Sequence, residues 1–302
     1  MQSVDLSRPL PFHLERLKGH AWVYQERLES LDWIMNMIRT ESRTMDLLSI
    51  SNRHLALASE ALHGAAAPAR AFEHLQQMHY LGIKGYKRKL MADGDTLSVK
   101  IPADTLVLKP LPADNRFLSY ADWTIYFWSA VLHDQYQDMT YLVSIKEADN
   151  FNWELDPPSH MMSDILAGFF RVKAGDVAAL IQDFVSATEF GKISTASYDH
   201  VANVTLPTID VMLKIFGGAE EVQYRQAMYL ALQSHDKFYS LPRMAGHSVG
   251  DISLPLTALA KLAYRKFGYT LGFYSDYVPE YIYQIEDQAI SFEPLVSLEP
   301  TN

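Results

Sequence analysis

Apolar residues recur at helical spacing through the N-terminal third of the chain. The stretches Phe12–Ile38, Met45–Leu62 and Pro68–Gly82 place apolar side chains every three or four positions, with charged residues between them. Gly64 and Pro68 predict that one helix stops and the next begins there. The apolar positions of the first stretch are Leu14, Leu17, Trp22, Leu28, Leu31, Trp33, Ile34 and Ile38.

The second half shows the same spacing. Pro207 favours a helix start, whereas Gly217, Gly218 and Gly268 favour helix ends. An aromatic-rich stretch, 120–133, and the apolar run 139–145 precede these helices, and Pro157 with Pro158 breaks the regularity before they resume. The pattern predicts helices over 159–172, 175–190, 207–216, 219–239 and 252–267.

The period changes between residues 86 and 101. The short runs Tyr86–Met91 and Thr96–Ile101 flank Ala-Asp-Gly-Asp, which predicts a β-hairpin. Basic residues crowd the first run, a pattern typical of an edge strand that resists aggregation, although it also fits a phosphate contact. These residues are Lys84, Lys87, Arg88 and Lys89.

A proline-rich segment, 102–116, is the candidate boundary between two helical regions. Its three prolines, Pro102, Pro110 and Pro112, exclude a helix interior. We therefore predict an N-terminal region, 1–116, that carries the hairpin, and a C-terminal helical region, 117–302, which pack either separately or as one body. The expected fold class is mainly α, an irregular multi-helix bundle with one small β-hairpin near 86–101.

Charge is unevenly distributed along the chain. Residues 152–302 hold 10 Lys and Arg against 18 Asp and Glu, so most of the net charge of −10 lies there. Such a field repels nucleic acid and attracts basic partners, although acidity can also serve solubility alone. With no cysteine, no export signal and no long apolar run, we expect a soluble cytoplasmic protein that does not enter a membrane.

Three chemical motifs occur or are suggested in the chain, and none predicts catalysis. Gly246–Gly250 matches the G-x-S-x-G nucleophile elbow around Ser248, but a proline-broken segment precedes it and no histidine follows His247. Glu60 and His63 have the spacing of a metal-binding helix pair without a second such pair. The glycines form no phosphate loop. We expect no catalytic residue, no metal and no cofactor.

The C-terminal segment carries a distinctive order of motifs. Asp236, Phe238 and Tyr239 form a D-x-F-Y element, Arg243 follows, and a Leu- and Ala-rich helix leads through Gly268 to an S-D-Y-V-P box. The box contains Ser275, Asp276, Tyr277 and Pro279. This order resembles the Immunity protein 49 family of bacterial polymorphic-toxin systems, although the helix lacks the cysteine that family members often carry.

The motif residues can also be interpreted without the family. We expect Asp276 to cap a short helix near Pro279, and Tyr277 to pack its ring and bond its hydroxyl. The motifs would then stabilise the fold, with the toxin contact elsewhere on the surface.

The resemblance implies a protein that binds and neutralises a cognate toxin effector, with type VI secretion as one delivery route. The acidic half points to a basic nuclease as that toxin. Tyr281 and Ile285 could equally form the apolar face of a last helix. We nevertheless expect the partner-binding residues among exposed acids and tyrosines near the C-terminus: Glu280, Tyr281, Tyr283, Glu286, Asp287 and Glu293. Two alternatives remain, a serine hydrolase using Ser248 and a helical adaptor that binds a chaperone or secretion component.

Overall fold

The computed structural model describes residues 20–40, 46–101, 104–145, 151, 157–173, 175–244 and 247–284. The described residues group into two compact units, 20–118 and 119–284. Helices dominate both units, and β1 and β2 form a small antiparallel sheet, so the predicted mainly α fold with one small hairpin is confirmed. None of the described helices is long and apolar enough to cross a membrane.

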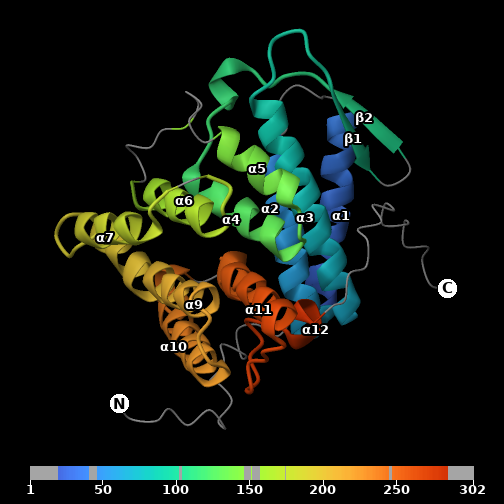
Figure 1. The fold of residues 1–302 in the computed structure, drawn as a ribbon. Coiled ribbons are helices and arrows are strands. Elements are labelled where there is room, and N and C mark those ends of the chain that lie inside the picture. The colour runs from blue at the N-terminus through green and yellow to red at the C-terminus, as the bar shows by residue number, and fades with distance from the viewer. Residues whose placement is uncertain are drawn as a thin grey trace. The chain divides into compact units, whose positions relative to one another are not determined.

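In the unit of residues 20–118, three helices run alongside one another, and the hairpin packs against α3 (Figure 1). Asp46 caps α2 by accepting a hydrogen bond from Leu48 N, and Pro68 opens α3, as expected for a first-turn proline. The elements are α1 Ala21–Thr40, α2 Leu47–Glu60, a π-helical turn Ala61–Ala65, α3 Pro68–Lys89, β1 Leu97–Ile101, β2 Asp104–Leu108 and a 3₁₀ turn Ala113–Asn115.

The predicted hairpin position was wrong in its first strand. Residues 86–89 are the last turn of α3, and β1 pairs instead with the following segment, with Val99 opposite Leu106. The turn at Ala92–Asp95 exists, and Gly94 adopts the positive φ that favours glycine, but the turn joins a helix to a strand.

The predicted edge-strand position of the basic residues is wrong, because Lys84, Lys87, Arg88 and Lys89 all lie in the last turns of α3. Arg88 Nε donates to the Lys109 carbonyl at 2.8 Å, and Lys89 Nζ pairs with Asp46 at 2.9 Å and donates to the Phe117 carbonyl. Cations at a helix C-terminus also interact favourably with its dipole. Arg88 and Lys89 therefore belong to a helix with long-range partners, although the local sequence pattern predicts a strand.

The unit of residues 119–284 is built around α4, whose aromatic side chains form its core. Trp123 stacks on Phe127 with ring centroids 5.0 Å apart and donates from Nε1 to the Leu142 carbonyl at 2.8 Å. Both α6 and α11 pack against α4. The elements are α4 Tyr120–Leu132, α5 Tyr136–Ile145, α6 Pro157–Phe169, α7 Val177–Ala187, α8 Thr195–His200, a π-helical turn Val201–Thr205, α9 Leu206–Phe216, α10 Glu221–Tyr239, 3₁₀ turns Pro242–Met244 and Ser248–Gly250, α11 Leu254–Phe267 and α12 Glu280–Tyr283.

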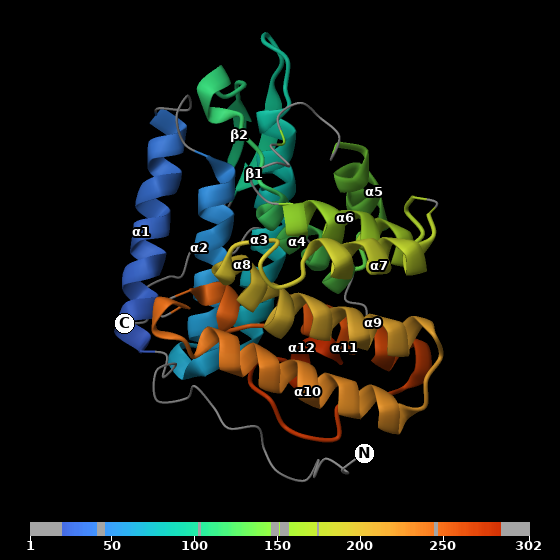
Figure 2. The ribbon, with the colours of Figure 1, turned by 90° about the vertical axis from the view of Figure 1, so that its left-hand side faces the viewer.

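Local signals explain the boundaries of the last long helices. Glu220 and Gln223 form a capping box at the start of α10, and Gly268 ends α11 in the left-handed conformation that glycine adopts without strain. In Figure 2, α9 and α10 lie side by side, in agreement with their contacts. The predicted helices over 207–216 and 252–267 are confirmed closely, whereas α8 was not predicted.

A buried polar chain links the three helices of the first unit. The hydroxyl of Tyr24 on α1 lies 2.8 Å from His74 Nε2 on α3, and His74 Nδ1 lies 3.0 Å from His54 Nδ1 on α2. All three side chains are buried. Burial lowers the pKa of His74 to about 4 and lowers that of His54 well below its ordinary value. Both imidazoles are therefore neutral near pH 7.

The two histidines should make the protein sensitive to acid. Because their folded-state pKa values lie below the unfolded value of about 6.5, the unfolded chain takes up protons first as the pH falls. Stability is fully present well above pH 6.5 and declines toward pH 4; the pKa shift of His74 alone accounts for about 2 kcal/mol between pH 7 and pH 4.5, and protonation of His54 adds to this loss. Urea unfolding at a series of pH values measures this decline. The variant His74→Gln, which no longer titrates, should show a shallower decline, and an unchanged one would contradict the assignment.

Candidate partner-binding surface

The D-x-F-Y element and the S-D-Y-V-P box pack directly against each other. The Tyr277 hydroxyl donates to Asp236 Oδ1 at 2.7 Å, and the Tyr277 ring is almost fully buried against His235. The predicted packing of Tyr277 is therefore confirmed. The Tyr277 carbonyl accepts from Ser253 N at 2.9 Å, which ties the box to the start of α11.

The other motif residues extend these contacts. Phe238 is buried with its ring edge-on to Tyr239, and Arg243 pairs with Asp199 on α8 at 2.5 Å. Ser275 is buried as well, and Pro279 directly precedes α12.

Asp276 does not have the predicted capping role. No side chain caps α12, and Asp276 instead accepts a short hydrogen bond from the Tyr274 hydroxyl. Tyr274 is two residues from Asp276 in the sequence, whereas α12 begins only at Glu280. The Tyr274 hydroxyl is therefore the available donor for the Asp276 carboxylate. The box thereby orients a tyrosine that the sequence pattern did not single out.

The surroundings of Ser248 are not those of a nucleophile elbow. An elbow needs a strand before the serine and a helix directly after it. Here the 3₁₀ turn Pro242–Met244 precedes it, and Ser248 itself begins a second 3₁₀ turn. A side chain at Gly250 would meet the Tyr239 ring at 2.2 Å, so this glycine serves close packing. The described part of the G-x-S-x-G match, from His247 to Gly250, is a packed turn between α10 and α11.

A pocket of about 300 Å³ lies beside the box. The loop between α11 and α12 forms most of its wall, and α12 contributes Glu280 and Tyr283. Ser275 Oγ is buried there and has no hydrogen-bond partner among the described residues. The lining residues are Thr270, Leu271, Gly272, Phe273, Tyr274, Ser275, Val278, Glu280 and Tyr283.

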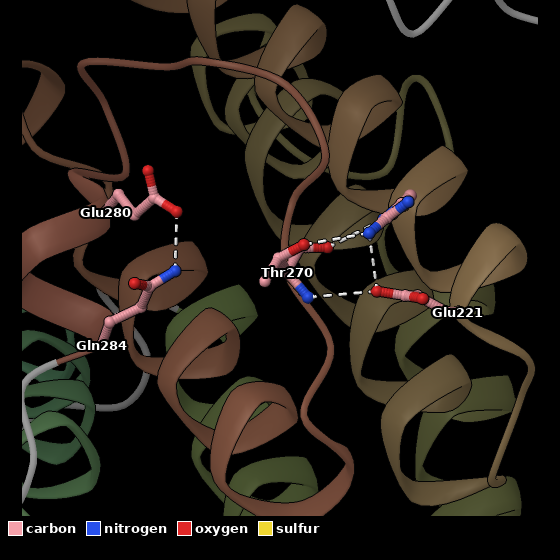
Figure 3. A network of polar contacts seen from close by, with 5 residues as sticks. Glu221, Thr270, Glu280 and Gln284 are labelled. Carbon is pink, nitrogen blue, oxygen red and sulfur yellow. Dashed lines mark hydrogen bonds and ion pairs between the residues drawn. The ribbon is translucent and has the colours of Figure 1, made fainter.

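Arg225 on α10 holds the loop in place. Its Nε donates to the Thr270 carbonyl at 3.1 Å, and its Nη2 donates to Thr270 Oγ1 at 2.9 Å and to Glu221 Oε1 at 2.7 Å (Figure 3). Gly272 has a positive φ, and a side chain there would lie 2.8 Å from the guanidinium. A glycine is needed for this close approach. The pocket wall is therefore rigidly supported from α10.

The predicted partner-binding residues fall into three groups. Glu280 and Tyr281 are exposed, Tyr281 to 37%. Tyr283 is only 2% exposed and packs edge-on against Tyr264, so its expected exposure was wrong. It occupies the buried face of α12 together with Ile282. The remaining three, Glu286, Asp287 and Glu293, lie outside the described residues.

Tyr274 was missed in the sequence, although its side chain is 63% exposed. The hydrogen bond to the Asp276 carboxylate raises the pKa of the Tyr274 phenol to about 12, so the phenol stays protonated at neutral pH. Burial raises the pKa of Tyr281, and the electrostatic effect of the nearby Tyr274 raises it further. The sequence offered only the position of this tyrosine, directly before the S-D-Y-V-P box, and its exposure required the structure. We call Tyr274, Glu280 and Tyr281 the box surface.

The box surface has the chemistry of a binding site. Two neutral phenols offer aromatic area and hydrogen bonds, and Glu280 adds a negative charge; among the described residues its carboxylate accepts from Gln284 alone, at 2.6 Å. Tyrosines give interface area at low conformational entropy cost. The described residues contain no group of three or more His, Asp or Glu arranged to hold a metal ion.

Comparison with known proteins identifies the fold family of this arrangement. Neither the curated proteins nor the solved structures gave a match. The sequence profile described as Immunity protein 49 matches residues 51–282, a span that begins within α2 and ends within α12. Because the match covers most of the chain and includes both motifs and the loop that carries the pocket, the chain belongs to the Immunity protein 49 family.

Proposed function

We propose that this protein neutralises a cognate antibacterial toxin by forming a tight complex with it, and that the box surface contributes to the interface. Membership of an immunity protein family over residues 51–282 is the observation that carries the proposal. A protective complex needs nanomolar affinity or better, about −12 kcal/mol, and an interface of roughly 1,600 Å². The box surface would form one part of such an area.

The proposed toxin is a nuclease. Residues 152–302 carry a net charge of −8, and Glu280 of the box surface has no cationic partner among the described residues. An acidic inhibitor attracts the basic cleft in which a nuclease holds nucleic acid, which raises the rate of association. The same charge disfavours direct binding of nucleic acid by this chain.

Binding, without catalysis, is the proposed mechanism. Ser248 lies in a packed 3₁₀ turn, and the phenols of the box surface are protonated at neutral pH. The protein would act in the cytoplasm of the producing cell, where a nuclease meets its substrate, against a toxin delivered for example by type VI secretion. No cofactor, metal or membrane takes part in this mechanism.

Co-expression tests the proposal directly. The C-terminal domain encoded by the gene beside this one is expressed in a bacterium with the protein, with its Ser248→Ala variant, or alone, and growth and co-purification are scored. We expect growth to be restored equally by both forms, with a stable complex in each case.

The other outcomes separate the rival functions. Growth restored without a complex, and lost in Ser248→Ala, would favour an enzymatic antidote. A complex with a secretion component, without protection from the toxin, would favour an adaptor. DNA and RNA integrity in the unprotected cells tests whether the toxin is a nuclease.

A further inference from the structure

One face of α1 combines two exposed tryptophans with two glutamates. Glu26, Glu29 and Trp33 follow Trp22 by four, seven and eleven residues, and this spacing places all four on one side of the helix. Trp22 is 68% exposed and Trp33 is 62% exposed. We call these four residues the tryptophan stripe. The two indoles lie about 16 Å apart along the helix axis.

The stripe is not required by the core of its own unit. The opposite face of α1, which packs on α2, buries Tyr24, Leu31, Ile34 and Ile38. The sequence pattern had counted both tryptophans among the apolar positions of this helix, but they lie on the side facing away from α2. Tryptophan is rare on free surfaces and is enriched among the residues that dominate binding energy. The stripe is therefore suited to a protein interface.

The charge of the stripe indicates the kind of partner. Glu29 accepts a hydrogen bond only from the neutral amide of Gln25, at 3.2 Å, and Glu26 has no ion pair within the described residues. The exposed Asp32 lies beside them on the same helix. Two described cations near the stripe have other partners: Arg27 pairs with Glu60 of α2 at 3.5 Å, and Arg53 of α2 donates to the Ser30 hydroxyl of α1 at 3.1 Å. A partner with basic side chains between two apolar contact points would complement this face.

The position of α1 in the sequence adds a second argument. Helix α1 ends at Thr40, before the family match begins at residue 51. Its outer face therefore lies outside the matched span, so the family match does not fix the residues of the stripe. Specificity is a difference of affinities between partners, and residues outside a shared pattern can supply it.

We propose that the tryptophan stripe is a docking surface for the basic face of the cognate toxin domain and that it sets the specificity of the pair; the proposal rests on the function proposed above. Both indoles insert into apolar contact points on the toxin, and Glu26 and Glu29 pair with cationic side chains between them. The box surface, inside the matched span, would then contribute mainly affinity, and the stripe, outside it, would contribute selectivity.

Binding measurements on the full chain test the stripe. The probe is the purified toxin domain encoded by the adjacent gene, inactivated by mutation and titrated calorimetrically. We expect Trp22→Ala with Trp33→Ala to weaken binding about 100-fold. Glu26→Lys with Glu29→Lys should slow association, with a reduced dependence on salt. The control Phe117→Ala removes an equally exposed aromatic side chain from the same unit and should leave affinity unchanged.

Each result has a defined meaning. If the wild-type chain binds and the stripe variants bind equally well, the stripe proposal is wrong while the proposed function stands. If the wild-type chain forms no complex, both fall. If the chain alone sediments as a dimer that Trp22→Ala with Trp33→Ala dissociates, the stripe binds a second copy and the toxin assignment is overturned. Circular dichroism of each variant verifies that the helices are retained.

Discussion

Replacing Lys261 with alanine is expected to lower the free energy of unfolding of the protein by about 3 kcal/mol. Lys261 on α11 is only 6% exposed. Its ammonium donates to the Leu132 carbonyl at the end of α4, at 2.8 Å, and to Asp134 Oδ2 at 2.7 Å. Removing it leaves a buried carbonyl without its partner and opens a cavity between two core helices.

Arg265 provides the matched control, because it pairs with the same Asp134 oxygen at 2.6 Å from an exposed position. Exposed ion pairs contribute little, so Arg265→Ala should cost less than about 1 kcal/mol. Lys261→Met keeps most of the apolar volume and isolates the loss of the charge. Urea unfolding followed by tryptophan fluorescence and circular dichroism gives all three values. Equal destabilisation by Lys261→Ala and Arg265→Ala would show that burial of the ammonium is unimportant.

Helices bounded by proline and glycine could be predicted from the sequence with small errors. Pro207 and Gly217 frame α9, and Gly268 ends α11, because these residues act on the local backbone and need no distant partner. The contact of Lys261 with Leu132 spans 129 positions in sequence, and no local pattern encodes it. The division into regions 1–116 and 117–302 stays a prediction about independent folding.

Amphipathic spacing predicts a helix without saying which way each large residue faces. The local pattern predicted a strand at 86–89. That prediction was wrong because the partners of Arg88 and Lys89, which are Lys109, Asp46 and Phe117, are distant in the sequence. Trp22 and Trp33 were grouped with the core residues for the same reason. Tyr281 and Tyr283 are only two positions apart in α12, yet the first is exposed and the second is buried. The sequence pattern did not distinguish them.

The box surface was only partly predictable. Glu280 and Tyr281 follow the S-D-Y-V-P box and were singled out as acids and tyrosines near the C-terminus. Tyr274 required the structure, because its orientation depends on the Asp276 carboxylate and on a loop held by Arg225. Tyr277 packs inside, as expected, and Asp276 of the same box orients Tyr274, which the motif does not include.

The triple variant Tyr274→Ala, Glu280→Lys, Tyr281→Ala should weaken the complex with the toxin about 1,000-fold, the largest effect on binding that we expect. Each exposed tyrosine is assigned about 1–2 kcal/mol as an interface contact, and reversal of the charge adds repulsion from a basic partner. Calorimetry or surface plasmon resonance with the inactivated toxin domain measures the loss, and growth protection should fail with it. Phe190→Ala, which removes an exposed aromatic side chain elsewhere in the same unit, should have no effect.

Single variants distinguish a direct contact from a loss of structure. Tyr274→Phe keeps the ring and removes the hydrogen bond to Asp276, so a small loss of affinity would assign the contact to the ring, and a loss equal to that of Tyr274→Ala would assign it to the hydroxyl. Because the pKa of this phenol is about 12, affinity should not change with its ionisation between pH 6 and pH 9. Tyr283→Ala, at a buried position, should lower the melting temperature, which neither exposed tyrosine variant should do. If the triple variant binds normally while folded, the toxin contacts another face, and immunity by binding still stands on the co-expression result.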